Sequence, residues 1–218
     1  MKVAIFMRGP FRPDLESGLV RARALAQEVR DHGGEPTLFF ATWMLEDRAA
    51  LATLVAQPDV GNVLAVEPPS DEMIYRICGI TELPNGKDVR NVFYQYFLSR
   101  VGLEVVDRTG KFDFVVHSRP DLDIRFGEHF DEWFTEGFYT TIHFGSREGL
   151  GFTNDQIGVA TPENMYSFWN YGTLENLGEM IRQAGIPENV LDKMYLNSGV
   201  QPKAGVCEVW RLDERRFL

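Results

Sequence analysis

Short apolar segments alternate with helical segments over residues 1–66, and this alternation constrains the fold more than any other feature of the sequence. Lys2–Met7, Thr37–Thr42 and Asn62–Val66 are predicted strands, and Leu15–His32 and Glu46–Ala56 are predicted helices between them. The first strand is continuously apolar, which is typical of a strand buried on both faces of a parallel sheet. We therefore predict an α/β fold, with a mainly parallel (mixed) central sheet flanked by helices and a helical C-terminal part.

The alternation is interrupted after the third strand. Ser70–Lys87 is poorly periodic, ends in a Pro-Asn-Gly sequence and is predicted to be a long loop. A helix over Val89–Val106 then leads into the strand that begins near Phe112. The later elements are predicted as strands at Phe138–His143, Ile157–Ala160 and Val206–Trp210 and helices at Pro162–Tyr171, Leu174–Ala184 and Pro187–Leu196. We find no repeat or linker, and expect one domain over residues 1–218.

Composition narrows the classes of function. The chain has 218 residues, of which 44% are hydrophobic and 25% charged, as in ordinary soluble globular proteins. Its net charge of -10 argues against non-specific nucleic-acid binding, but a few arginines can still form a local site for a small anion. No segment approaches the ~20 apolar residues of a membrane span, so we expect at most peripheral membrane association. Cys78 and Cys207 lack metal-type spacing and are predicted to be reduced thiols in a cytoplasmic protein.

Two carboxylates, Asp121 and Asp123, follow an apolar run that stops at Arg119-Pro120. In an extended backbone the two acids face one side while Leu122 faces the other. Converging carboxylates suit a hard divalent cation such as Mg²⁺ or Mn²⁺, which usually shares its site with substrate phosphates. A surface turn with solvated acids would be preferred for an isolated Asp-x-Asp. Its place at the end of a strand in an α/β chain favours a ligand site instead.

Two further segments carry candidate residues. Arg8-Gly9-Pro10-Phe11-Arg12 follows the first strand, so a parallel sheet would bring it to the same edge as the two acids. Its arginines could bind phosphate oxygens, and Gly9 would allow a nucleotide close approach. For the pentapeptide taken alone, a plain strand-to-helix turn with solvated arginines is the preferred interpretation. Gly149–Gln156 leads to Asp155, either a general base or ligand for a hydroxylated substrate, or part of an Asx turn that starts a strand.

Histidines and aromatic residues discriminate little between functions. His117 lies in the strand that leads to the two acids, and Pro120 leaves open which side of the strand it faces. His143 ends the next strand and could be a ligand, but a structural histidine is the preferred interpretation. The aromatic clusters within residues 93–97 and 166–171 are interpreted as mostly core, with one or two sugar- or base-stacking platforms that the sequence does not single out.

The order of these motifs resembles a known family. A first strand ends in Gly9-x-x-Arg12, a second ends in Thr42-Trp43, and a helix carries Tyr94-Gln95. The series continues with Arg119-Pro-Asp-Leu-Asp123, Asn154-Asp-Gln156 and a Pro187-Glu188 helix start. Over nearly its whole length the chain is similar to GT-A-fold nucleotide-sugar glycosyltransferases, specifically small members linked to bacterial and viral surface-polysaccharide (lipopolysaccharide or capsule) synthesis.

The resemblance implies roles for individual residues. Asp121 and Asp123 would hold Mn²⁺ or Mg²⁺ against the donor diphosphate, with Asp123 as the direct ligand, and the metal would neutralise the leaving group. The remaining assignments are a nucleotide contact for Arg8, Gly9 and Arg12, a sugar or phosphate contact for Arg119, and an acceptor or anomeric-carbon contact for Asp155. Many metal-dependent relatives add a late histidine ligand. No histidine follows His143 here, so the third ligand is unassigned.

The predicted function is metal-dependent transfer of a sugar from a nucleotide-diphosphate sugar to a saccharide or other hydroxyl acceptor. A non-catalytic nucleotide-sugar or glycan-binding protein on the same scaffold is the alternative. A phosphatase or phosphotransferase that uses Asp-x-Asp is disfavoured, because those folds place the pair directly after the first strand, where this chain has Arg8-Gly9-Pro10.

Overall fold

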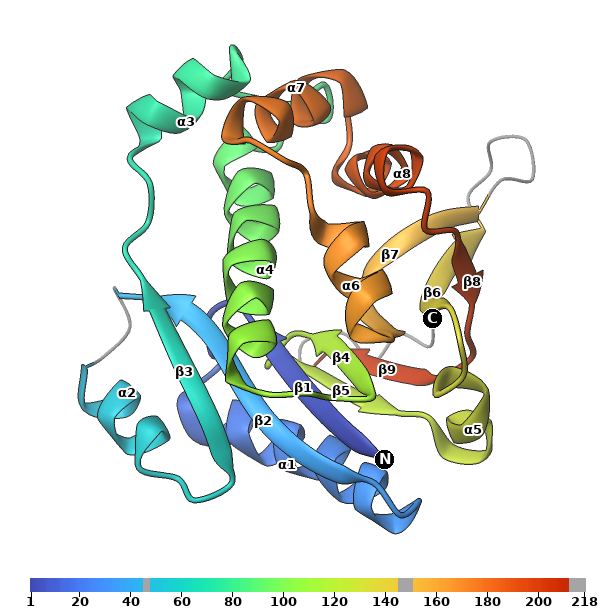
Figure 1. Cartoon of the computed structure of the whole chain (residues 1–218). Helices are drawn as coiled ribbons and strands as arrows, with labels where there is room; N and C mark the ends of the chain where they lie inside the picture. Colours follow the sequence, from blue (N-terminus) through green and yellow to red (C-terminus); the bar gives the residue numbers. More distant parts are fainter. Residues whose placement is uncertain (45–47, 145–150, 212–218) are drawn as a thin grey trace.

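The centre of the protein is a mixed seven-stranded sheet, described in a computed structural model for residues 1–44, 48–144 and 151–211. The strand order is β3-β2-β1-β4-β7-β6-β8 (Figure 1). Strands β1 to β4 run parallel to one another, whereas β7 is antiparallel to both β4 and β6. The predicted mixed α/β sheet is confirmed. The strands are β1 (Lys2–Arg8), β2 (Glu35–Trp43), β3 (Val60–Val66), β4 (Phe114–Ser118), β6 (Phe138–Phe144), β7 (Gly151–Ala160) and β8 (Pro202–Ala204).

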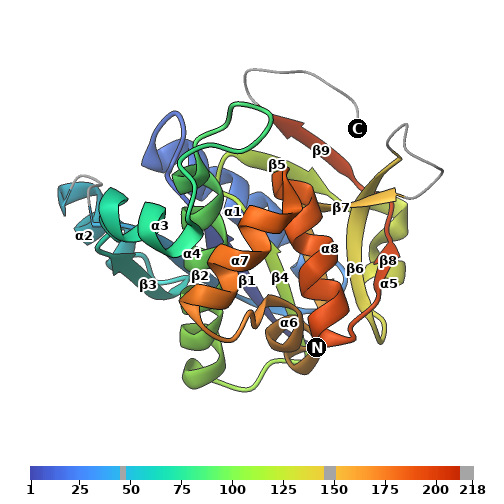
Figure 2. The ribbon, with the colours of Figure 1, turned by 90° about the horizontal axis from the view of Figure 1, so that it is seen from above.

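Helices cover both faces of this sheet. One face packs against α1 (Leu15–Asp31) and α2 (Arg48–Val55), and the other against α4 (Val89–Thr109) and α6 (Pro162–Trp169). Three further helices are α3 (Asp71–Cys78), α7 (Leu174–Ala184) and α8 (Pro187–Ser198). Helix α7 contacts both α3 and α8, and Figure 2 shows the three helices from above. A two-stranded sheet of β5 (Leu122–Arg125) and β9 (Glu208–Arg211) and the short α5 (Phe130–Trp133) complete the α1 side.

The alternation of side chains along β1 separates the two halves of the core. Ala4 and Phe6 pack in the cluster on the α4 face, whereas Val3, Ile5 and Met7 pack in the cluster on the α1 face. Successive side chains of a strand point to opposite faces of the sheet. Arg8 follows the parity of Ala4 and Phe6, so it is directed to the α4 face at the carboxyl end of β1.

One predicted loop is partly helical. Ser70–Lys87 was expected to be irregular, but α3 spans Asp71–Cys78 within it. The Ser70 hydroxyl accepts a hydrogen bond from the Met73 amide at 3.3 Å, and Gly79 ends the helix in the left-handed conformation. Only Ile74 and Cys78 of this helix are fully buried. With only two buried residues, the apolar pattern of this segment is too short to predict a helix from the sequence.

The Asp-x-Asp segment also differs from the prediction. The strand β4 ends at Ser118, Pro120 and Asp121 form a turn, and Asp123 lies in β5, which pairs with β9 of the second sheet. Proline has no amide hydrogen for a strand ladder, so the chain leaves the central sheet here. Leu122 is buried, as predicted.

The strand predicted at Ile157–Ala160 is longer in the structure. Strand β7 already begins at Gly151, so Asp155 lies within a strand and does not follow a loop. Residues 145–150, and the side chains of His143 and Asn154, lie outside the described part of the chain.

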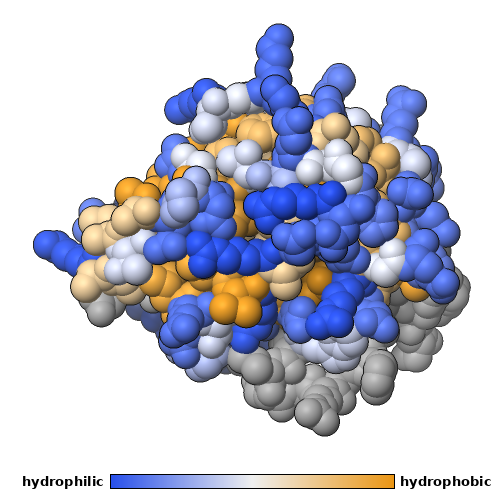
Figure 3. All heavy atoms as spheres, turned by 90° about the horizontal axis from the view of Figure 1, so that it is seen from below, coloured by the Kyte–Doolittle hydropathy of each residue, from blue (hydrophilic) through white to orange (hydrophobic). Residues whose placement is uncertain are grey.

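The surface is mixed in polarity. Seen from below, it shows hydrophilic residues interspersed with hydrophobic patches (Figure 3). Within the described ranges, no helix combines the length and the apolarity that a membrane span requires.

Candidate functional site

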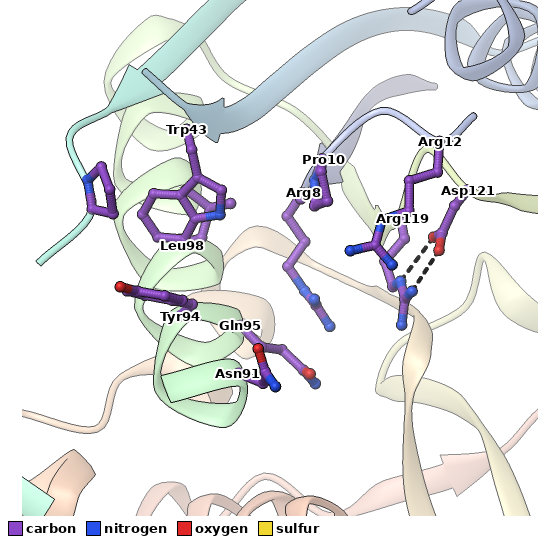
Figure 4. A pocket seen from close by; sticks show the side chains of 12 residues that line it. Arg8, Pro10, Arg12, Trp43, Asn91, Tyr94, Gln95, Leu98, Arg119 and Asp121 are labelled. Carbon is purple, nitrogen blue, oxygen red and sulfur yellow. Dashed lines mark hydrogen bonds and ion pairs between the residues drawn. The ribbon is translucent and has the colours of Figure 1, made fainter. Parts of the chain in front are cut away.

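A cavity of about 510 Å³ lies where the carboxyl ends of β1, β2, β3 and β4 meet the first half of α4 (Figure 4). Ligand sites in parallel α/β sheets characteristically form at this edge. Five of the residues selected from the sequence, Arg8, Gly9, Arg12, Arg119 and Asp121, line it together. The complete described lining is Arg8, Gly9, Pro10, Arg12, Trp43, Pro68, Asn91, Tyr94, Gln95, Leu98, Arg119 and Asp121.

Arg8 is a buried cation held in place by Asp155. Its side chain is only 5% exposed, and its Nη2 donates to Asp155 Oδ2 at 2.7 Å and to the Asp155 carbonyl at 3.1 Å. Gln95 Nε2 donates to the same carboxylate oxygen at 2.5 Å. Burial lowers the pKa of Arg8 and the negative charge of Asp155 opposes that shift, so the guanidinium stays charged. Arg8 Nε is buried and has no hydrogen-bond partner among the described residues.

Arg119 and Asp121 form a second ion pair on the side of the cavity that carries Arg8 and Arg12 (Figure 4). Arg119 Nε donates to Asp121 Oδ1 at 2.9 Å, and Arg119 Nη2 donates to Oδ2 at 2.6 Å. Burial disfavours the charge, but the pair with Asp121 outweighs it and raises the pKa of Arg119. From α1, Arg21 Nη1 donates to the carbonyls of Arg12 and Pro120 at 3.1 and 2.9 Å. Arg21 thereby joins the loop that carries Arg12 to the loop that carries Arg119. These two residues and Arg8 are called the arginine wall of the cavity.

The described side chains do not form a ready two-carboxylate cation site. Both oxygens of Asp121 accept hydrogen bonds from Arg119, and Asp123 on β5 is not among the described residues that line the cavity. In the described ranges, no group of three or more His, Cys, Asp or Glu side chains is arranged to hold a metal ion. The metal site at Asp121 and Asp123 therefore stays a prediction from the sequence.

Aromatic rings form the wall opposite Arg119 and Asp121 (Figure 4). The ring centroids of Trp43, at the end of β2, and Tyr94, on α4, are 4.9 Å apart. Tyr94 donates its hydroxyl hydrogen to the Pro69 carbonyl at 3.0 Å, which holds the segment after β3 beside the cavity. The rule that ligands bind at strand carboxyl ends could have selected Trp43 from the sequence. Tyr94, Gln95 and Asn91 enter the site only through the packing of α4.

His117, whose orientation the sequence leaves open, is a core residue. It lies in β4, is fully buried, and its Nε2 is 3.0 Å from the Ser99 hydroxyl oxygen. The Phe6 and Trp169 rings pack against its imidazole. Burial, with the nearby positive charge of Arg8, holds the pKa of His117 well below its ordinary value of 6.5, so the folded protein keeps the ring neutral.

This buried neutral histidine makes stability fall as the pH falls below 6.5. The unfolded chain takes up the proton first because its histidine pKa is the higher one, so protonation favours unfolding. At pH 5 the unfolding free energy lost through this one group is expected to be at most about 2 kcal/mol. Urea unfolding at pH 7 and pH 5 measures it. His117→Gln should lose correspondingly less between the two pH values, and equal losses in both proteins would contradict the assignment.

Comparison with known proteins identifies the fold. No protein-family model matches the sequence, and no curated protein is detectably similar to it. The galactosyltransferase LgtC in complex with donor and acceptor sugar analogues matches with a TM-score of 0.52 at 12% identity, over 93% of this chain and 73% of that one. An active-site mutant of LgtC matches with a TM-score of 0.53 at 12% identity, over 93% and 72% of the two chains. The chain has a GT-A-type glycosyltransferase fold. What it binds must follow from its own cavity.

Proposed function

We propose that this protein transfers a sugar from a nucleotide-diphosphate sugar to a hydroxyl group of a saccharide acceptor. One observation carries the proposal: in a GT-A-type fold, a single cavity places an aromatic wall opposite an arginine wall. A nucleoside diphosphate has the complementary shape, with an aromatic base at one end and a charged diphosphate at the other. Aromatic side chains stack on bases, and arginine matches phosphate oxygens in geometry and charge.

The two walls give the donor an orientation. The base would lie against Trp43 and Tyr94, and the diphosphate would lie towards Arg8, Arg12 and Arg119. The pocket volume of about 510 Å³ is within the range of small-molecule sites.

The arginine wall is suited to the charge that develops during transfer. The bond from the anomeric carbon to the diphosphate oxygen breaks, and the acceptor oxygen forms a bond to that carbon and loses its proton. The departing nucleoside diphosphate keeps the electron pair of the broken bond and gains negative charge. Preorganised cationic donors stabilise such a leaving group, so Arg8 and Arg119 would act there. We derive no step through a metal ion, because Arg119 already holds Asp121.

Asp155 has a positioning role in this proposal. Its carboxylate binds Arg8 and Gln95 and fixes the Arg8 guanidinium at the cavity. The general-base role assigned from the sequence stays a prediction.

A donor panel tests the proposed function. The protein is incubated with UDP- and GDP-sugars, with CMP-sugars as donors that carry a single phosphate, and with saccharide acceptors, and released nucleotide is measured. We expect release from at least one nucleotide-diphosphate sugar. A raised melting temperature with no turnover on any acceptor would instead favour the non-catalytic binding protein.

Removing the aromatic wall should weaken nucleotide binding. Trp43→Ala deletes the ring beside Tyr94, and base–aromatic stacking contributes about 1–3 kcal/mol per base. We expect the Kd of the preferred nucleoside diphosphate to rise about tenfold to a hundredfold by calorimetry. Trp43→Phe keeps a stacking face and should stay within a few-fold of the parent. Equal losses in the two variants would rule out stacking as the contribution of Trp43.

The setting of the reaction is also proposed. The resemblance to enzymes of surface-polysaccharide synthesis suggests a growing saccharide chain as the acceptor. Cys78 and Cys207 are free thiols buried in the clusters on opposite faces of the sheet, which supports the cytoplasmic location predicted from the sequence.

A further inference from the structure

We propose that the arginines of the cavity take the place of a divalent cation, so that this protein binds its nucleoside diphosphate without metal. This inference rests on the proposed function. It depends on the contacts of Arg119 and Arg8 and on the balance of charge in the cavity wall.

Arg119 occupies the position that a cation would need. Its planar guanidinium contacts both Asp121 oxygens at 2.9 and 2.6 Å, and the two side chains are only 20% and 16% exposed. Paired parallel hydrogen bonds of this type are among the strongest that arginine makes. A metal ion at Asp121 would have to displace a well-packed, bidentate partner. A phosphate can instead approach the guanidinium from the cavity and leave the pair intact.

Arg8 provides a second cationic contact that is incomplete without an anion. Its side chain is 95% buried and is fixed by Asp155, yet its Nε has no partner among the described residues. A buried donor without a partner is unfavourable in a folded protein. A phosphate bound beside the Arg8 guanidinium would bring an acceptor towards this nitrogen. Figure 4 shows the Arg8 side chain directed into the cavity, between the aromatic wall and Arg119.

The charge balance of the cavity agrees with this role. Its described ionised lining consists of three arginines, Arg8, Arg12 and Arg119, against one aspartate, Asp121. Counting Asp155 as well, which pairs with Arg8, the three arginines exceed the two aspartates by one positive charge before a diphosphate binds. On a chain with a net charge of -10 this excess is a local concentration of opposite sign.

Calorimetric titration of UDP and GDP into metal-free protein tests the proposal. We expect one of the two to bind in EDTA with a Kd within about threefold of that in Mn²⁺, a difference below the 1.4 kcal/mol that a tenfold change represents. Arg119→Gln should raise the Kd in EDTA at least tenfold.

Arg23→Gln is the matched control. Arg23 makes the same bidentate pair, with Asp59 at 2.7 and 2.8 Å, but it is not among the described cavity residues. The Arg23→Gln variant should bind the nucleotide in EDTA with the same Kd as the parent protein. Circular dichroism and the melting temperature establish that each variant folds. Arg12→Gln alters an exposed side chain of the same wall, so it should fold and should weaken binding in EDTA even if Arg119→Gln does not fold.

The outcomes separate the two proposals. Binding and turnover that require Mn²⁺ would overturn metal independence and support the cation site at Asp121 and Asp123, while leaving sugar transfer in place. Unchanged binding in EDTA by folded Arg119→Gln or Arg12→Gln would also overturn the arginine role. If neither nucleotide binds with or without Mn²⁺, and no sugar nucleotide is turned over, both proposals fail.

Discussion

Replacing Arg8 with glutamine is expected to abolish sugar transfer and to raise the Kd of the nucleoside diphosphate about a hundredfold. The change removes the buried guanidinium of a residue that lines the cavity. Removing one partner of a buried, hydrogen-bonded charge pair at a binding site costs about 2–5 kcal/mol. Calorimetry measures the Kd of the nucleoside diphosphate, and nucleotide release from the preferred donor measures the transfer activity. A transfer rate within tenfold of that of the parent protein would show that Arg8 does not have the proposed role in the reaction.

Stability must be separated from binding in this experiment. Without Arg8, the Asp155 carboxylate loses its cationic partner, and breaking a buried ion pair costs about 3–5 kcal/mol of unfolding free energy. The double variant Arg8→Gln/Asp155→Asn replaces both charges with amides and should regain much of that loss. It should not regain binding, because the cation for the diphosphate is still missing. Recovery of binding in the double variant would show that Arg8 serves only to neutralise Asp155.

Replacing Gly102 with valine should destabilise the protein by about 3 kcal/mol, because α4 packs directly on the sheet at this glycine. A Cβ atom at Gly102 would lie 2.9 Å from the Ala41 Cβ and closer still to the Phe6 ring. Phe6 and Ala41 are both buried at 1% exposure, so neither has room to move. Urea unfolding measures the loss.

Gly110→Val is the matched control for this substitution. Gly110 ends the same helix, is exposed, has an extended backbone, and would place a Cβ at 3.7 Å from its nearest neighbours in Phe112. We expect it to change the unfolding free energy by less than about 1 kcal/mol. If the two variants lose equal stability, close helix–sheet packing at Gly102 is not the cause of the loss.

The packing at Gly102 also affects the cavity. Close packing at Gly102 sets the distance between α4 and the sheet, and the first half of α4 supplies Asn91, Tyr94 and Gln95 to the cavity. Gly102→Val should therefore weaken nucleotide binding as well, even under conditions in which it remains folded.

Elements with long, uninterrupted patterns were predictable from the sequence. The apolar run of β1 and the apolar periodicity of α1 identified both elements to within one residue at each end. By contrast, α3 and β8 are short and carry few buried residues, so no periodic pattern distinguishes them from loop. Pro120 marked the end of β4, but only the pairing of β5 with β9 shows that the chain enters a second sheet.

The sequence by itself determined the parallel strands, and hence that Arg8, Arg12, Arg119 and Asp121 follow strand ends that meet at one edge. This follows from strand direction and chain order alone, because the loops after parallel strands all lie at the carboxyl edge of the sheet. No side-chain contact is needed to predict it. The tertiary structure decided which side chains meet. It paired Arg8 with Asp155, gave Asp121 to Arg119, and brought Tyr94 to Trp43. These contacts depend on the register of β7 and the approach of α4, which are set by packing between residues far apart in the chain.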